Sequence, residues 1–217
     1  MNLRHKKPRP LTREEKPFRD ARLFVIATED THSPAQYFKL FRNTRINVKI
    51  LPTADGLSSP EHVLKRLETY RKEIGPQEGD ELWLVLDTDH WVEPNHIANF
   101  VQVCSQAVQK GFQLAHSNPC FEVWLLLHQT DLHSSEQFQR CAEVIQRLKT
   151  ILDGYNKRGT VKGEWFPPES ITLAIERAET LDSTPDDRWP QKTGSHVYKL
   201  VKSLRQFSKG IAEDTNP

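Results

Sequence analysis

The sequence predicts an α/β protein: a parallel sheet of about four strands flanked by helices, followed by a helical C-terminal extension. Two observations lead to this prediction. Up to residue 132, short apolar runs typical of buried strands alternate with segments of helical periodicity, as in proteins whose parallel strands are joined by helices. From residue 133 onward, only helical patterns follow.

A chain of 217 residues can bury one core and at most a small second subdomain. We therefore expect three parts: a flexible basic tail over residues 1–20, a Rossmann-like α/β core over residues 21–132, and a helical extension over residues 133–217. The tail is rich in Lys and Arg and poor in apolar residues. It is either a disordered terminus or an arm that contacts phosphate.

The first half of the core contains two strand–helix units. Leu23–Ala27 is apolar throughout, which is typical of a central strand buried on both faces. Ser33–Phe41 is a predicted helix with a serine N-cap and a proline in its first turn. Ile46–Ile50 alternates as a second strand, and the helix Ser59–Ile74 ends at Gly75.

The second half of the core repeats the pattern. The run Glu81–Leu86 is a third buried strand, and Pro94–Lys110 carries one apolar stripe of a helix. Phe112–Ala115 is a weaker fourth strand, and Phe121–His128 is a strongly apolar helix. These segments complete the predicted parallel sheet.

The extension is predicted to consist of helices alone. Their ranges are Ser135–Leu152, Pro168–Leu181 and Ser195–Phe207. The connecting loops, Gly154–Pro167 and Asp182–Thr193, are rich in Pro, Gly, Lys and Asp. We expect these helices to pack on the α/β core.

Three carboxylates directly follow two of the predicted strands. Glu29 comes just after the first strand, and Asp87 and Asp89 come just after the third. The carboxyl ends of parallel strands lie along one edge of a sheet, so these side chains converge if the two strands are neighbours. Carboxylates bind Mg²⁺, or Mn²⁺ in its place, and leave positions open for phosphate oxygens. Alternatively, the acids only cap helices or occupy turns.

Further candidate site residues lie near the fourth strand and in a later loop. Asn118 precedes the helix Phe121–His128, whose N-terminal N–H groups can bind an anion, and Glu122 is a candidate additional metal ligand. Lys157 and Arg158 lie in a glycine-flanked loop from which a cation can reach phosphate. Asn118, Lys157 and Arg158 are candidate nucleic-acid contacts, unless they serve only as a cap and as surface residues.

The histidines give a weaker signal. His90 follows the acidic pair and is a metal ligand, a proton carrier or an ordinary loop residue. His32 and His116 lie near predicted strand ends, and His128 ends an apolar helix, where its charge suits the helix dipole.

Composition restricts the environment and the partners of the chain. The formal net charge is only +1, so any attraction to nucleic acid must come from local patches. Cys104, Cys120 and Cys141 lie far apart without C-x-x-C spacing, which predicts a reduced, cytoplasmic protein without a zinc knuckle or disulfide framework. The N-terminus lacks an apolar signal core and no apolar run is long enough for a bilayer, so we expect no membrane partner.

Several blocks of the sequence match one known family. The most specific is Ser117–His128, with the sequence S-N-P-C-F-E-V-W-L-L-L-H. Thr28-Glu29 with Tyr37-Phe38 downstream, and Asp87-Thr88-Asp89, match as well, while Lys157 and Thr193–Val197 match more weakly. Through these blocks, which run from about Leu23 to Leu204, the chain resembles the RloB family.

This resemblance implies a Toprim-like domain, the magnesium-binding fold of topoisomerases, primases and related nucleases. It implies Glu29 as the first-strand glutamate and Asp87 with Asp89 as the D-x-D pair. RloB proteins are typically encoded beside an ATPase in bacterial anti-phage loci, so it also implies an abortive-infection effector controlled by an ATPase partner. The family often has glycine after its first glutamate, where this chain has Asp30.

Our leading hypothesis is a Mg²⁺-dependent Toprim-type nuclease acting on DNA or RNA, tRNA included. Glu29, Asp87 and Asp89 would hold the metal, with Glu29 also a general base and Lys157 stabilising the pentavalent phosphorus. The first alternative is a non-catalytic Toprim-like module that docks on the ATPase or senses a phage component. The second is a primase-like transferase, for which no nucleotide-binding signature is present. The sequence leaves open the substrate, the number of metal ions and whether the chain forms a homo-oligomer.

Overall fold

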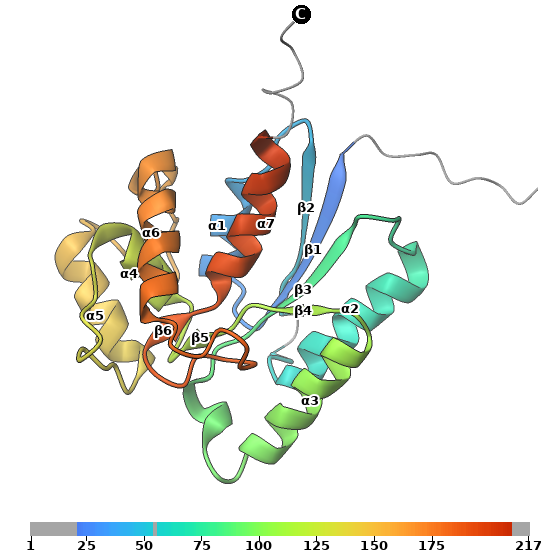
Figure 1. Cartoon of the computed structure of the whole chain (residues 1–217), viewed down its shortest axis with the longest axis horizontal. Helices are drawn as coiled ribbons and strands as arrows, with labels where there is room; N and C mark the ends of the chain where they lie inside the picture. The colour runs from blue at the N-terminus through green and yellow to red at the C-terminus, as the bar shows by residue number, and fades with distance from the viewer. Residues whose placement is uncertain (1–20, 54–55, 210–217) are drawn as a thin grey trace, which may run out of the picture.

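A computed structural model describes residues 21–53 and 56–209 as one parallel sheet with helices on both faces (Figure 1). The strand order is β2-β1-β3-β4, and the strands are β1 Arg22–Thr28, β2 Ile46–Leu51, β3 Glu81–Val85 and β4 Gln113–Leu114. The α/β fold class is confirmed, and the arrangement is consistent with a Rossmann-like or Toprim-type sheet. The expected basic tail, residues 1–20, lies outside the described residues.

Seven α-helices accompany these strands in the described part of the chain. They are α1 Ser33–Lys39, α2 Pro60–Ile74, α3 Ile97–Gln109, α4 Glu122–Gln129, α5 Cys141–Ile151, α6 Pro168–Leu181 and α7 Val197–Lys209. Two 3-10 turns cover Asp89–Val92 and Gly163–Trp165, and a second small sheet pairs β5 Ser117–Asn118 with β6 Gly194–Ser195. None of the helices in this part of the chain is both long and apolar enough to cross a bilayer.

Both faces of the sheet are buried, which explains why its central strands are apolar at every position. Along β1, Phe24 and Ile26 join the core on one face, whereas Val25 and Ala27 join the core on the other. The helices α2 and α3 cover the second face, and α1 and α7 cover the first (Figure 1). Alternate residues of each strand therefore contribute to two separate cores.

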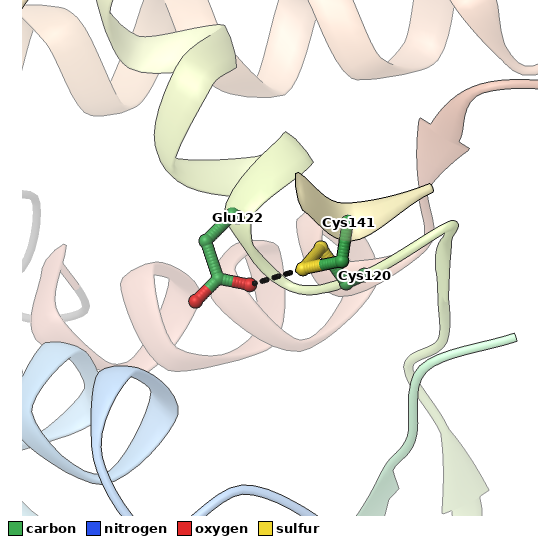
Figure 2. A group of neighbouring side chains, drawn as sticks. All are labelled: Cys120, Glu122 and Cys141. Carbon is green, nitrogen blue, oxygen red and sulfur yellow. Dashed lines mark hydrogen bonds between the residues drawn. A yellow bond between two sulfur atoms is a disulfide. The ribbon is translucent and has the colours of Figure 1, made fainter. Parts of the chain in front are cut away.

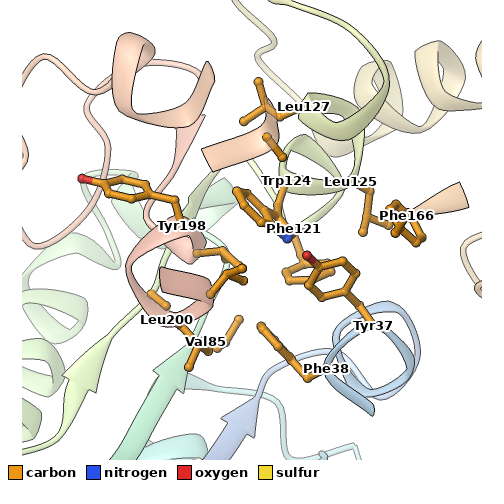
Figure 3. Close-up of a cluster of buried hydrophobic side chains, with 14 of the residues drawn as sticks. Tyr37, Phe38, Val85, Phe121, Trp124, Leu125, Leu127, Phe166, Tyr198 and Leu200 are labelled. Carbon is orange, nitrogen blue, oxygen red and sulfur yellow. The ribbon is translucent and has the colours of Figure 1, made fainter. Parts of the chain in front are cut away.

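The larger core lies between the sheet, α1 and the C-terminal helices, and Tyr37 of α1 is fully buried in it (Figure 3). The Tyr37 hydroxyl forms a hydrogen bond with Nε2 of His128 at 3.0 Å, so its polar end is satisfied inside the core. Aromatic rings surround it at centroid separations of 5.4 to 6.2 Å: Phe38, Phe41, Phe121, Trp124, His128 and Phe166. This cluster joins α1 to α4.

The C-terminal extension completes the same core. The cluster of buried residues that begins with Phe24 of β1 continues to Leu204 of α7. The extension is also tied to the sheet edge by β6, which pairs with β5 in antiparallel fashion, and by a 2.7 Å hydrogen bond between the hydroxyls of Ser117 and Ser195.

Several predicted boundaries were wrong where long-range contacts replace local signals. The extension is not purely helical, because Gly194–Ser195 forms a strand with the segment before α4. The helix predicted from Ser135 begins only at Cys141. Before it, the backbone N–H of Phe138 donates to the Thr193 hydroxyl at 2.7 Å, which holds this segment out of a helix.

Two other helix starts also differ from the prediction. Asn118 is not the cap of an adjoining helix but a residue of β5, and α4 begins four residues later, at Glu122. The helix predicted from Pro94 begins at Ile97, after the 3-10 turn Asp89–Val92. In both places, residues that the sequence pattern assigns to a helix form irregular backbone near the strand ends instead.

The burial of the central strands leads to a first prediction. Leu84 of β3 is fully buried, so Leu84→Ala is expected to lower the free energy of unfolding by about 2–5 kcal/mol through lost burial and a residual cavity. The measurement is urea unfolding followed by circular dichroism. Leu173→Ala is the matched control, since Leu173 is 44% exposed and its truncation is expected to cost less than about 1 kcal/mol. Equal losses in the two variants would contradict this assignment of the core.

Candidate metal centre

The carboxyl ends of β1 and β3 bring Glu29 and Asp87 together. The two strands are neighbours with Thr28 opposite Val85, so the residues that follow them leave the sheet at one edge. The backbone N–H of Asp87 lies 3.4 Å from Oε2 of Glu29 and donates to it. The two strands are therefore neighbours, which is the condition under which the sequence predicts that these side chains converge.

The backbone at the end of β1 is held by residues of the next strand–helix unit. The hydroxyl of Thr53 donates to the carbonyl of Glu29 at 2.6 Å. The guanidinium of Arg66 donates to the carbonyl of Thr28 at 2.8 Å. On the side-chain side, the indole N–H of Trp91 donates to Glu29 at 3.1 Å. Glu29 is therefore fixed both through its backbone and through its carboxylate.

Removal from solvent disfavours the charged form of both carboxylates. Burial raises the pKa of Glu29 to about 7, against the opposing effect of the Trp91 hydrogen bond. The pKa of Asp87 is raised well above its ordinary value, first by burial and then by the charges of Glu29 and Glu122. Lys157 and the N–H of Phe121, which donates to Asp87 at 2.8 Å, act in the opposite direction.

Asp89 stands apart from this pair in the present conformation. Its carboxylate accepts hydrogen bonds from the backbone and the imidazole of His90, and its side chain is 40% exposed. The ligand atoms of Glu29, Asp87 and Asp89 do not all lie within 4.8 Å of one another. The D-x-D pair is thus placed at the expected edge, but the structure does not bring all three carboxylates to one point.

Glu122, which is buried, and Lys157, which is partly exposed, form a charge cluster beside Asp87. The ammonium of Lys157 lies 3.3 Å from Oδ2 of Asp30 and 3.4 Å from Oε2 of Glu122. Burial alone would lower the pKa of Lys157, but the charges of Glu122, Asp87 and Asp30 outweigh it and raise that pKa. Lys157 is consequently a permanent positive charge inside the site, rather than a free surface lysine.

Two further contacts of Glu122 come from residues that no local motif marks as part of the site. Its Oε1 accepts from the hydroxyl of Ser33 at 3.1 Å and from that of Tyr155 at 3.3 Å. The side chain of Glu122 is fully buried. Ser33 and Tyr155 are far from Glu122 in the sequence. Asp30, the other partner of Lys157, had a local signal, because it follows Glu29 at the end of the first strand.

The other two predicted nucleic-acid contacts have different surroundings. The side-chain amide of Asn118 donates to the carbonyl of Pro190 at 2.9 Å, so it holds the loop before β6. Arg158 is exposed next to Lys157. Of the histidines, His32 and His90 are exposed, whereas His116 and His128 are buried and their pKa values are lowered by burial to about 3 and about 4.

The prediction of unpaired cysteines was wrong. Cys120 and Cys141 form a disulfide with a Cα–Cα distance of 5.5 Å, while Cys104 is free and buried. The packing of α4 against α5 brings the two cysteines together, and a separation of 21 residues carries no local spacing signal. The disulfide lies beside the charge cluster, because Sγ of Cys141 is 3.3 Å from Oε2 of Glu122 (Figure 2).

Comparison with known proteins places the chain in a family. A family model described as RloB-like protein matches residues 24–204, which is most of the chain. The chain belongs to the RloB-like family. Searches of curated proteins and of solved structures found no match. The matched range of this RloB-like chain contains Glu29, Asp87, Glu122 and Lys157, so the whole candidate site lies inside the family region.

The raised pKa of Glu29 leads to a prediction about pH. Between its ordinary pKa of 4.5 and its folded-state value of about 7, the folded state binds the Glu29 proton more tightly than the unfolded state. This contribution therefore favours folding below pH 4.5 and is lost as the pH rises through about 7. The side chain of residue 29 cannot ionise in Glu29→Gln. The free energy of unfolding of this variant minus that of the parent is therefore expected to be larger at pH 8 than at pH 4.5, by roughly 1–3 kcal/mol.

Urea unfolding at pH 4.5 and at pH 8 in EDTA measures this difference. Glu78→Gln is the matched control, because Glu78 is exposed and lies before the opposite end of β3. If Glu29→Gln and the parent change in stability by the same amount between the two pH values, the carboxyl of Glu29 is not buried as described.

The Lys157–Glu122 pair is expected to be strongly coupled. Removing either charge leaves the other unpaired in a poorly solvated position, so Lys157→Gln and Glu122→Gln should each lower the free energy of unfolding. The double variant should lose less stability than the sum of the two single losses. The expected coupling energy is about 1–3 kcal/mol in a double-mutant cycle. The exposed pair Lys202–Glu179 is the control, with a coupling below about 1 kcal/mol. Independent effects at residues 122 and 157 would refute the pairing.

Proposed function

We propose that this protein is a Mg²⁺-dependent, Toprim-type nuclease that hydrolyses phosphodiester bonds of DNA or RNA, tRNA included. It would act as the effector of a bacterial anti-phage system of the abortive-infection type, under the control of an ATPase encoded in the same locus. Membership of the RloB-like family and the parallel sheet support this assignment.

The observation that carries the proposal is the meeting of Glu29 and Asp87 at the ends of two neighbouring parallel strands. The 3.4 Å contact between Asp87 N and Glu29 Oε2 places two acidic side chains at the sheet edge where α/β proteins bind their ligands. Two carboxylates at one edge repel each other, and the positive charge of Lys157 compensates this repulsion only in part.

The donor chemistry of this edge fits Mg²⁺ or Mn²⁺. Glu29 and Asp87 offer oxygen ligands, which these hard cations prefer. Asp89 is two residues further on and would join them after its carboxylate leaves His90. Glu122, the fourth ligand considered from sequence, contacts Lys157, Ser33 and Tyr155 in the disulfide-bonded protein, so in the proposed nuclease it positions Lys157. Bound Mg²⁺ would polarise the phosphoryl group and stabilise the leaving oxygen.

The protein's own groups have complementary roles in this proposal. Glu29, with a pKa raised to about 7, is suited to accept a proton from water near neutral pH. Lys157 supplies a fixed positive charge that acts on Asp87 and is available to a negatively charged phosphate. Arg158, exposed beside it, adds a second positive charge for the nucleic-acid backbone.

One observation favours a second candidate function, a non-catalytic module that docks on the ATPase or senses a phage component. The carboxylate of Asp89 is bonded to His90, and the three acids do not converge within 4.8 Å. A module whose acids serve only as caps and surface residues would have this arrangement permanently. The nuclease requires Asp89 to turn toward Glu29 and Asp87.

A cleavage assay separates the two functions. Purified protein, with and without the neighbouring ATPase, is incubated with plasmid, phage DNA and total RNA in Mg²⁺ or in EDTA. We expect cleavage that EDTA abolishes and that Glu29→Gln and Asp87→Asn each reduce at least about a hundredfold, because both replacements keep the shape but remove metal-binding charge.

The controls are matched in chemistry. Glu78→Gln and Asp186→Asn make the same substitutions at exposed positions and should cleave like the parent. Circular dichroism verifies that every variant is folded. Activity that survives in Glu29→Gln and Asp87→Asn, or an absence of any metal-dependent cleavage with the ATPase present, would favour the docking module.

A further inference from the structure

A second group of potential metal ligands lies beside the proposed magnesium site. Within residues 21–53 and 56–209, one trio of His, Cys, Asp or Glu side chains has ligand atoms that all lie within 4.8 Å of one another: Cys120, Glu122 and Cys141 (Figure 2). Cys120 and Glu122 are buried, and Cys141 is partly exposed. Two sulfurs and one oxygen differ in kind from the all-oxygen ligands of Glu29 and Asp87.

We propose that Cys120, Glu122 and Cys141 form a redox-controlled site for a thiophilic divalent cation of the Zn²⁺ type. In the oxidised protein the two cysteines are joined as a disulfide and the site is closed. In the reduced protein the two thiolates and the carboxylate bind the cation. This inference goes beyond the proposed nuclease function and does not rest on it.

The distances suit tetrahedral coordination after reduction. Zinc takes thiolate sulfur at about 2.3 Å and carboxylate oxygen at about 2.0 Å, so a sulfur and an oxygen on one tetrahedral ion are about 3.5 Å apart. Sγ of Cys141 and Oε2 of Glu122 are already 3.3 Å apart. The Cα atoms of the two cysteines are 5.5 Å apart, so side-chain rotation is sufficient to bring both sulfurs to one ion.

The surrounding charges favour a cation in the reduced state. Two thiolates and Glu122 would place three negative charges at one point next to Asp87, and a buried anionic group of this kind is unstable unless it is compensated. Lys157 compensates part of it, since its ammonium is 3.4 Å from Glu122 and 3.7 Å from Sγ of Cys141. Because Lys157 is also paired with Asp30 at 3.3 Å, it keeps a partner when a divalent cation takes Glu122.

The conversion between the two states is a balanced two-electron step. A dithiol reductant attacks the disulfide, most accessibly at the partly exposed Cys141, and transfers two electrons and two protons. The S–S bond breaks, two thiols form, and the reductant becomes a disulfide. Binding of the divalent cation then displaces the two thiol protons to solvent. Three protein ligands leave a fourth tetrahedral position for water, as in other open zinc sites.

Cobalt substitution tests the proposal on the full chain. The protein is reduced with dithiothreitol, desalted under argon and titrated with Co²⁺, whose thiolate complexes absorb in the near ultraviolet. We expect this charge-transfer band to saturate at about one Co²⁺ per chain, to disappear on addition of Zn²⁺, and to be missing from the oxidised protein. The comparison of the reduced and oxidised parent needs no substitution, so it is independent of any folding defect in a variant.

Variants identify the ligands. Cys120→Ser and Cys141→Ser are expected to weaken Co²⁺ binding at least about tenfold and to reduce the thiolate band, while Glu122→Gln weakens binding but keeps the band. Cys104→Ala is the matched control, because Cys104 is buried against His116 in another part of the core, and its band should equal that of the parent.

The readout contains no cleavage step, so a failed nuclease assay leaves it unaffected. A reduced, folded parent without a thiolate-to-cobalt band would overturn the proposal. So would a band that persists unchanged in both Cys120→Ser and Cys141→Ser, or one that disappears in Cys104→Ala alone.

Discussion

The parallel pairing of β1 with β3 is the constraint on which the candidate site depends. With Thr28 opposite Val85, both strands end at the same edge, and the following residues, Glu29 and Asp87, are neighbours. The two carboxylates repel each other, so the packing of the two cores must hold Glu29 and Asp87 in these positions. A slip of one residue in register would exchange the side chains of β1 between the cores, and that cost fixes the register.

The parts of the fold that the sequence predicted are those governed by short-range rules. An uninterrupted apolar run such as Leu23–Ala27 identifies a strand buried on both faces, and alternation with helical segments implies parallel neighbours. The edge position of Glu29 and Asp87 follows from polarity alone. Helix α6 was predicted with its observed bounds, Pro168–Leu181, because Pro at its start and an apolar stripe define it locally.

The features that the sequence did not predict arise from contacts between distant segments. Lys157 lies in the loop between α5 and α6 and meets Asp30 and Glu122 only in the folded protein. Its neighbours in the sequence therefore carry no sign of its burial. The pairing of Ser117 with Ser195 spans 78 residues and produces a small sheet from residues without strand propensity. The disulfide likewise depends on how α4 meets α5.

Three consecutive residues that lead into α4 connect the two proposed centres. Cys120 is held by Cys141, the N–H of Phe121 donates to Asp87, and Glu122 holds Lys157. The backbone between them has no flexible linker, because Phe121 and its neighbours are buried. Any displacement of Cys120 therefore changes the hydrogen bond to Asp87 and the position of the Lys157 charge. The sulfur cluster therefore shares one turn of backbone with Phe121, the residue whose N–H holds Asp87, so the geometry of one centre constrains that of the other.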